Sequence, residues 1–405
     1  MLQAAHDFAT GAVAFLFVLG LVVTVHELGH FLAAKACGVA IDRFSIGFGR
    51  ALWSWRDKSG VEWRLAWIPL GGYVRFAGDE NAASVPNAEE LAALRAEVLA
   101  REGPRALNSY FHFKPVWQRA IVVAAGPLAN FVLSIVLTAG LLAAIGERTL
   151  PARIDTITPN EPAAIAGFQP GDLIERADGQ IIDSFDSLQQ YVQIRAGTPI
   201  RFQVERSGHE LTLTATPISR EIDNGLGGRQ TVGALGISAV HQASDIRYQR
   251  FGPLQALSGG VSRTWDKLTT SVFIINRLIH GELPAGQLSG PLGIAQLSGA
   301  VVHAGAAGEP TLGLKLLGAL TNLLNLAAIL SVSVGFMNLL PVPVLDGGHL
   351  LFYAFEAATR RPLGAKLQAA GYRVGLALLL GLMLFATWND LQRLRVFKLL
   401  GGFFS

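Results

Sequence analysis

The sequence predicts a polytopic α-helical membrane protein with about four transmembrane helices, a membrane-associated β-hairpin or sheet element and an inserted extracytoplasmic domain that is mostly β. The 405 residues are 51% hydrophobic and only 16% charged, whereas soluble domains average about 25% charged residues. Four segments are long and apolar enough to span a bilayer, which takes roughly 20 mostly apolar residues. Short β runs lie between the second and third of these segments.

Charge and cysteine content exclude two classes of function. The net charge of +3 is small, and no basic stripe with interleaved aromatic residues is present, so no nucleic-acid partner is expected. The single cysteine, Cys37, allows neither an intrachain disulfide nor a thiolate metal cluster. We expect Cys37 to pack as a small buried hydrophobe.

The first span, about residues 8–34, contains the motif His26-Glu27-Leu28-Gly29-His30. Ionisable groups at that depth of a membrane are costly and mark a functional site. In a helix, His26 and His30 leave the same face and can share one metal ion, while Glu27 stays close enough to act on a water at that metal. The alternative is two histidines that hydrogen-bond within a helix bundle.

Residues 41–79 are expected to form the β element. Two alternating runs flank residues 56–60, with Gly60 in the turn. Tryptophan together with arginine and lysine favours the membrane interface. An edge strand there could hold an unwound substrate by strand addition, although a plain interfacial hairpin explains the pattern equally well.

The rest of the chain divides by hydropathy and charge. Arg263, Asp266 and Lys267 argue against a fifth span at 253–282 and for an amphipathic helix. In chain order the expected segments are span one (1–40), the β element (41–79), a cytoplasmic loop with a polar helix at 84–103 (80–116), span two (117–146, apolar over 120–145), the β domain (150–220), an extracytoplasmic linker with amphipathic helices (221–318), span three (319–346, apolar over 323–344), and span four with the tail (347–405, apolar over 369–387).

The distribution of positive charge sets the expected topology. The loop after span one is rich in Lys and Arg and the residues before it have none, which places the N-terminus outside and this loop in the cytoplasm. Span two then returns the chain outside, and span three brings it back. The histidine motif and the end of span three both lie near the cytoplasmic face in this scheme. The basic tail runs mildly against the rule, and we expect it to be an amphipathic surface helix.

The end of span three carries the second cluster of polar residues, Asn338-Leu-Leu-Pro-Val-Pro-Val-Leu-Asp346-Gly-Gly-His349. A catalytic zinc keeps three protein ligands and one open position. On residue chemistry, Asp346 is favoured as the third ligand and His349 is its rival. The alternative is a Pro/Gly turn in which Asp346 only caps a helix.

These motifs resemble those of a known family. HELGH at 26–30 and NLLPVPVLDGG at 338–348 resemble the site-2 protease family (peptidase family M50) of intramembrane zinc metalloproteases, close to the bacterial regulator-of-sigma-E branch. Further stretches also look like that branch: FSIGFG at 44–49, IPLGGYV at 68–74, FKPVWQR at 113–119, AGPLAN at 125–130 and SGPLGIAQ at 289–296.

The resemblance implies a complete site. It implies that His26, His30 and Asp346 bind Zn²⁺ and that Glu27 is the catalytic base, and so it decides for Asp346 over the rival histidine. Asn338 and Pro341 match family positions near the scissile segment of the substrate. A helix-packing hydrogen bond is the alternative for the asparagine.

The implied activity is an intramembrane endopeptidase of the bacterial inner membrane. Its substrates would be transmembrane segments of single-span proteins such as anti-sigma factors or remnant signal peptides, and its surroundings would be membrane lipid. The alternative is a non-catalytic membrane scaffold or metal carrier that docks its partners.

The extracytoplasmic segment carries a resemblance of its own. The sequence PAAIAGFQPGDLI at 162–174 resembles PDZ domains of bacterial envelope proteases. One such domain is expected at about 150–220, and no second copy of the pattern is present, unlike in members with two PDZ domains. A PDZ groove accepts an extended peptide as an added strand, so a peptide is a further expected partner.

Overall fold

The computed structural model describes residues 2–78, 88–223, 229–239, 247–281, 290–308 and 310–393. The chain forms two compact units. The first comprises Met1–Ala139, Leu257–Asn276 and Leu288–Leu391, and the second comprises Gly140–Ala256, Arg277–Gln287 and Gln392–Ser405. The predicted tail helix after residue 393 lies outside the described residues.

Four helices of the described chain have the length and apolar composition to cross a membrane. The candidate spans are Ala9–Ala36 within α1 (Leu2–Ala36), Val116–Ala144 (α3), Leu312–Asn338 (α8) and Lys366–Gln392 within α10 (Ala365–Arg393). Together with the β element, they confirm the predicted fold class of a polytopic helical membrane protein.

The third span lies earlier in the chain than its apolar stretch, about 323–344, indicated. Helix α8 begins at Leu312 and ends at Asn338, and the break expected at Pro341 and Pro343 lies beyond its end. Pro341 and Pro343 follow in a turn, since proline lacks the amide donor that a helix interior needs. A new helix, α9 (Asp346–Thr359), then begins at the aspartate.

Helix α7 (Pro291–Ala306) packs against both α1 and α8. The contact with α1 is close because Gly11 has no side chain: a Cβ there would lie 2.6 Å from the carbonyl oxygen of Ala295. Residues 221–318 were expected to form a linker with amphipathic helices, and this apolar helix lies within them. Further along the chain, α6 (Pro253–Ile279) occupies the segment expected to be amphipathic.

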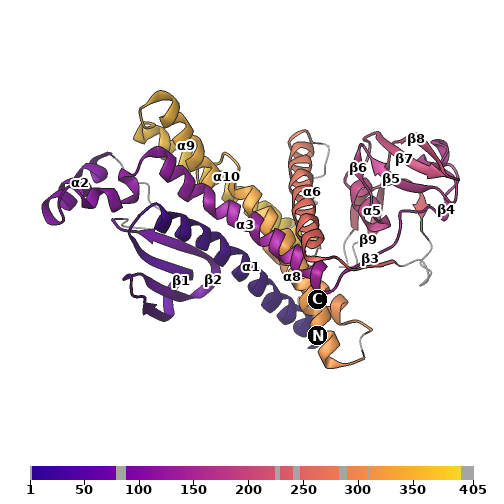
Figure 1. Cartoon of the computed structure of the whole chain (residues 1–405), viewed down its shortest axis with the longest axis horizontal. Helices are drawn as coiled ribbons and strands as arrows, with labels where there is room; N and C mark the ends of the chain where they lie inside the picture. Colours follow the sequence, from indigo (N-terminus) through magenta and orange to yellow (C-terminus); the bar gives the residue numbers. More distant parts are fainter. Residues whose placement is uncertain are drawn as a thin grey trace, which may run out of the picture. The chain divides into compact units, whose positions relative to one another are not determined.

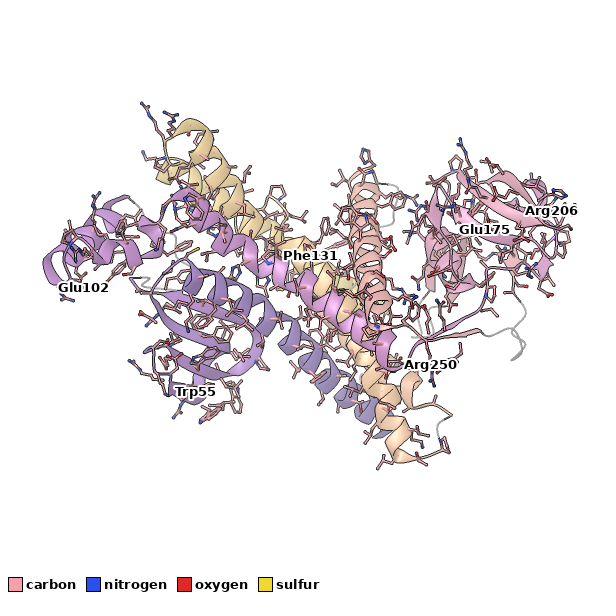
Figure 2. The ribbon with its side chains drawn as sticks, in the orientation of Figure 1. Trp55, Glu102, Phe131, Glu175, Arg206 and Arg250 are labelled. Carbon is pink, nitrogen blue, oxygen red and sulfur yellow. The ribbon has the colours of Figure 1, made fainter. Side chains whose placement is uncertain are left out.

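A long hairpin of β1 (Ile41–Arg56) and β2 (Glu62–Phe76) lies beside α1 (Figure 1). As predicted, Gly60 occupies its turn, with a φ of 87°. The Asp57 carboxylate accepts hydrogen bonds from the Trp63 indole and from Ser59, which lower its pKa to about 2. Trp55 lies near the turn end and is exposed (Figure 2).

The loop after the hairpin contains a helix and two short 3₁₀ turns. Helix α2 (Ala88–Arg101) falls within the polar helix expected at 84–103, of which residues 84–87 lie outside the described residues. The turns η1 (Ala106–Ser109) and η2 (Phe111–Phe113) follow. Tyr110 lies between the two turns, and its hydroxyl donates a 2.8 Å hydrogen bond to Glu102. Glu102 is the residue that follows α2 and is labelled in Figure 2.

The second unit is built on a four-stranded antiparallel sheet with strand order β6-β5-β7-β8. Its elements are β3 (Glu147–Thr149), β4 (Thr156–Ile157), α4 (Pro162–Ile165), β5 (Leu173–Ala177), β6 (Gln180–Ile181), α5 (Phe185–Gln193), β7 (Ile200–Arg206), β8 (His209–Ala215), β9 (Ile218–Asp223), β10 (Arg229–Ala234), β11 (Ile237–Ser238) and β12 (Arg247–Gln249). Leu235 belongs to the same buried core as Ile174 and Phe202. The domain therefore continues beyond residue 220, where its end was expected.

Candidate metal centre and catalytic residues

Helix α1 brings the two histidines of the motif to one point. Because His26 and His30 are one helical turn apart, their rings meet edge to face and their Nε2 atoms lie 3.2 Å apart. His26 is buried, with 8% of its surface exposed. Both histidines line the same cavity, and their Nε2 atoms are close enough to bind one shared ligand.

Helix α9 supplies the third group. Oδ2 of Asp346 lies 3.2 Å from Nε2 of His26 and 3.5 Å from Nε2 of His30. The aspartate stands in the first turn of α9, where the helix dipole favours a negative charge. Thus the turn at Pro341 and Pro343 ends one helix and starts the next at the residue that faces the histidines.

The three side chains fit a zinc ion. Zinc–nitrogen and zinc–oxygen bonds of about 2.0–2.1 Å in a tetrahedron place neighbouring donor atoms roughly 3.3–3.4 Å apart. The separations of 3.2, 3.2 and 3.5 Å are close to that edge length. Among the described residues, Oδ2 of Asp346 is also buried without a hydrogen-bond partner, which fits an atom that can bind a cation.

A contact with α3 determines which ring nitrogen of His30 carries the hydrogen. Its Nδ1 lies 2.9 Å from the backbone carbonyl oxygen of Val122, which can only accept a hydrogen bond. Nδ1 therefore carries the hydrogen and Nε2 keeps its lone pair. Partners of this kind orient the histidine ligands of metal sites.

Glu27 lies beside the three potential ligands and lines the same cavity. It packs against β2, where a Cβ on Gly72 would lie 2.9 Å from Cγ of Glu27 and 2.8 Å from the carbonyl oxygen of Ser45. The missing side chain of Gly72 thus makes room for the glutamate. A carboxylate next to a metal site, but outside its ligand set, is placed to accept a proton.

The cavity has a volume of about 440 Å³ and combines apolar walls with a few polar groups. Asn338, the last residue of α8, lines it, and so does His349. His349 lies 3.0 Å from the hydroxyl of Tyr372 and stands outside the cluster of potential metal ligands among the described residues. Pro341 lies in the turn before α9 and is not among the cavity-lining residues of the described chain.

The sequence marks 125–130 of α3 by its family resemblance, but no site residue was predicted in this helix. Arg119 forms a 2.6 Å ion pair with Glu356 and lies over the ring of Tyr353, linking α3 to α9 at the cavity. Further along α3, Gly126 contacts the ring of His30 and Asn130 contacts that of His26. The available signal was the four-residue spacing of Gly126 and Asn130 in an apolar helix.

A comparison with family models matches residues 14–382 to peptidase family M50. The chain belongs to this family. It is 53% identical to Metalloprotease MmpA of Caulobacter vibrioides, with 97% of this chain and 98% of that protein covered. It is 41% identical to Atu1380 of Agrobacterium fabrum, a protein named as a zinc metalloprotease, over 97% of this chain and 99% of the relative.

A more distant relative is Regulator of sigma-E protease RseP of Salmonella typhimurium, which is 30% identical, with 94% of this chain and 98% of the relative covered. The resemblance found in the motifs is thereby confirmed. The protein is a membrane-bound metalloprotease of this family, and its cofactor is zinc.

Proposed function

We propose that the protein is an intramembrane zinc endopeptidase, with His26, His30 and Asp346 as the metal ligands. The observation that carries this proposal is the convergence of three metal-binding side chains on the wall of a cavity, two of them within a helix long and apolar enough to span a membrane. Buried ionisable groups of that kind are retained for function.

The residues around the centre have separate roles in the proposed mechanism. Zinc, when bound, supplies a Lewis acid that polarises a peptide carbonyl and acidifies a water. The carboxylate of Glu27 takes the proton of the attacking water and later delivers it to the nitrogen of the departing amine. The amide of Asn338, on the cavity wall, holds the backbone of the scissile segment or its carbonyl oxygen. Pro341 shapes the turn that follows this asparagine.

The proposed substrates are transmembrane segments of single-span proteins in the bacterial inner membrane. The name of the Salmonella relative, a regulator of sigma-E, supports anti-sigma-factor-like proteins as one class, and remnant signal peptides are a second. The basic first loop supports a cytoplasmic location for the nearby site. By the same topology, the second unit is extracytoplasmic.

The second unit is proposed to be a PDZ domain that accepts a peptide strand. Its motif at 162–174 forms α4 and the start of β5, and its sheet has an amphipathic helix, α5, nearby in sequence. In such domains an extended peptide pairs with an exposed strand. The hairpin of the first unit is proposed to contact membrane lipid through its exposed tryptophans.

The test compares the wild-type protein with Glu27→Gln in lipid nanodiscs that contain a single-span model substrate. We expect the wild type to cut within the span, and the variant to bind zinc normally and lose about 10²–10⁴-fold in rate. Near-normal cleavage by the variant would contradict the role of Glu27. Cleavage of only water-soluble peptides by the wild type would contradict intramembrane proteolysis.

A further inference from the structure

Asn130 of α3 faces the metal centre from outside. It is fully buried, and its side-chain Nδ2 lies 3.2 Å from Nδ1 of His26. Its Oδ1 is buried and has no hydrogen-bond partner in the part of the chain that the structure describes. A carboxamide in an apolar helix is costly unless its polar atoms are used. The only ring nitrogen of His26 that faces away from the other ligands is the one that Asn130 touches.

Metal binding determines which side chain, Asn130 or His26, donates the hydrogen bond between them. When Nε2 of His26 binds zinc through its lone pair, the proton of the neutral ring resides on Nδ1, which then needs an acceptor. Rotation of the Asn130 carboxamide by 180° exchanges Nδ2 and Oδ1 in the same space. We propose that Asn130 is a positioning residue whose Oδ1 accepts the Nδ1–H of His26 and so fixes the tautomer and orientation that bind zinc. This inference rests on the proposed zinc centre.

The inference gives α3 a repeated role. Val122, Gly126 and Asn130 are spaced four residues apart and therefore share one face of the helix. The carbonyl of Val122 holds Nδ1 of His30, and the amide of Asn130 meets Nδ1 of His26. Between them, Gly126 leaves room for the imidazole, since a Cβ there would lie 2.3 Å from Nε2 of His30. Helix α3 thus contacts both imidazole rings, that of His26 and that of His30, at Nδ1.

The backbone of Asn130 is itself fixed from α8. The Ser331 hydroxyl donates a 2.8 Å hydrogen bond to the Asn130 carbonyl, and a Cβ on Gly335 would lie 3.1 Å from Cβ of Asn130. Close packing at a small residue and an interhelical hydrogen bond both limit movement of α3 at this point. The carboxamide is therefore held at a defined distance from His26, as a residue that orients a ligand must be.

The test measures metal binding in the full-length protein, using zinc affinity by competition with a chelator and the visible spectrum of the cobalt-substituted form. Asn130→Leu removes the acceptor, and we expect about 10–100-fold weaker zinc binding and an altered cobalt spectrum. Asn130→Asp keeps an acceptor oxygen and is expected to restore most of the affinity and the wild-type spectrum. Ser134→Ala, one turn further along α3, removes a buried interhelical hydrogen bond to Thr264 and serves as the matched control with wild-type zinc affinity.

The outcomes distinguish a failure of the proposed zinc centre from a failure of the positioning role of Asn130. If His26→Ala keeps wild-type zinc affinity, the metal centre itself is wrong. If His26→Ala loses zinc while Asn130→Leu binds it as tightly as the wild type, only the positioning role is overturned. Equal weakening in the Leu and Asp variants, both folded by size exclusion, would also overturn it, because packing rather than an acceptor would then matter. Asn130→Ala replaces the Leu variant if the larger side chain prevents folding.

Discussion

At the scale of single residues, the site depends on which ring nitrogen of each histidine is free. His30 donates through Nδ1 to a backbone carbonyl, so its Nε2 is the atom left for a metal. That arrangement requires the ring to lie directly against α3. The helix can approach so closely only because Gly126 lacks a side chain.

Gly126→Ala should therefore damage the metal centre. The added Cβ would fall 2.3 Å from Nε2 of His30, so the ring must move. We expect zinc affinity to fall by about 10-fold or more, in the range seen when the partners of metal ligands are lost. Gly140→Ala is the matched control in the same helix, because no described atom outside the adjacent helix backbone lies within 4 Å of its Cβ. Equal zinc affinity in both variants would show that the ring tolerates the contact.

The third ligand can be tested by a second comparison. Asp346→Ala should release most of the zinc, since its Oδ2 faces both histidines, whereas His349→Ala should retain nearly stoichiometric zinc. Metal analysis of the two purified variants decides between them. The reverse order would make His349 the ligand and leave Asp346 as a helix cap.

Residues whose chemistry follows from a local motif could be proposed from the sequence. The spacing of His26 and His30 within an apolar run indicated a shared metal, and the order of Leu, Asp and Gly after α8 indicated a partner. The contact between Asn130 and His26 joins residues 104 positions apart. The carbonyl of Val122 has no side-chain signature at all, so its role required the packing of two helices.

At the scale of elements, the hairpin and α1 together define the position of Glu27, the proposed catalytic base. Glu27 is outside the cluster of metal-binding side chains in the described part of the chain, and β2 holds it through packing at Gly72 and a hydrogen bond from the backbone of Val74. The sequence predicted the hairpin and its turn, but not that β2 would meet Glu27 at a glycine.

Gly72→Ala should separate proton transfer from metal binding. The new Cβ would lie 2.9 Å from Cγ of Glu27 and 2.8 Å from the carbonyl oxygen of Ser45. Displacement of a reacting group by about 1 Å can cost roughly 10²-fold in rate. We expect a large loss of cleavage with unchanged zinc content. Ser54→Ala, at an exposed position of β1, is the control. Loss of zinc in the glycine variant would instead place β2 among the supports of the metal.

In the second unit, one buried ion pair joins the 162–174 motif to the sheet. Asp172 is fully buried and accepts two hydrogen bonds from Arg206, at 2.7 and 2.8 Å (Figure 2 labels Arg206). Burial acts to raise the pKa of this carboxyl, but the bonds from Arg206 and from the backbone of Gln169 outweigh it and lower the pKa. Stabilisation from this pair is therefore present above the unfolded pKa of about 3.9 and is lost as the pH falls through the lower folded value.

Arg206→Met should destabilise this unit by roughly 3 kcal/mol, because it leaves a buried carboxylate unpaired. Hydrogen exchange of β5 and β7 in the full-length protein measures the change at neutral pH. Below the folded pKa of Asp172 the difference from the wild type should shrink, since the carboxyl is then neutral in both proteins. Arg176→Met is the control: it replaces an exposed arginine that donates a hydrogen bond to the nearby carbonyl of Gly179, and it should change stability by less than about 0.5 kcal/mol. A pH-independent difference would contradict the ionic role.

The third span shows why element limits were harder to predict than element types. Hydropathy alone continues through 339–345, since leucine, valine and proline there are all apolar. Backbone chemistry stops the helix at Asn338, because two prolines follow within five residues. The prolines indicated a break near this end of the span, but not that the helix already ends at Asn338, before the chain turns toward the candidate metal site.

At the scale of the whole molecule, the candidate active site and the β domain belong to different units of the chain. Every residue that lines the cavity falls in the first unit. In the proposed topology the second unit is also on the opposite side of the membrane from the site. We therefore predict that this unit selects substrates by the size of their external parts and takes no part in the chemistry.

The strand pairing at the base of the second unit allows this prediction to be tested by excision. Strands β3 and β12 are antiparallel, with Glu147 opposite Gln249, so the chain enters and leaves the domain side by side. Residues 150–246 can be replaced by an Asn-Gly turn, which closes two antiparallel strands. The shortened protein is compared with the intact one on two single-span substrates, one with a short external stub and one with a bulky folded external domain.

A selecting domain predicts different effects on the two substrates. The stub substrate should be cut at a similar rate by both proteins, because the cavity and its ligands are unchanged. The bulky substrate should be cut faster by the shortened protein, because the obstacle to its entry is gone. Zinc content and the Glu27→Gln version of the shortened protein control for folding and for contaminating proteases. If the stub substrate is no longer cut while zinc remains bound, the domain must position substrates directly, most simply by pairing a peptide strand in its groove.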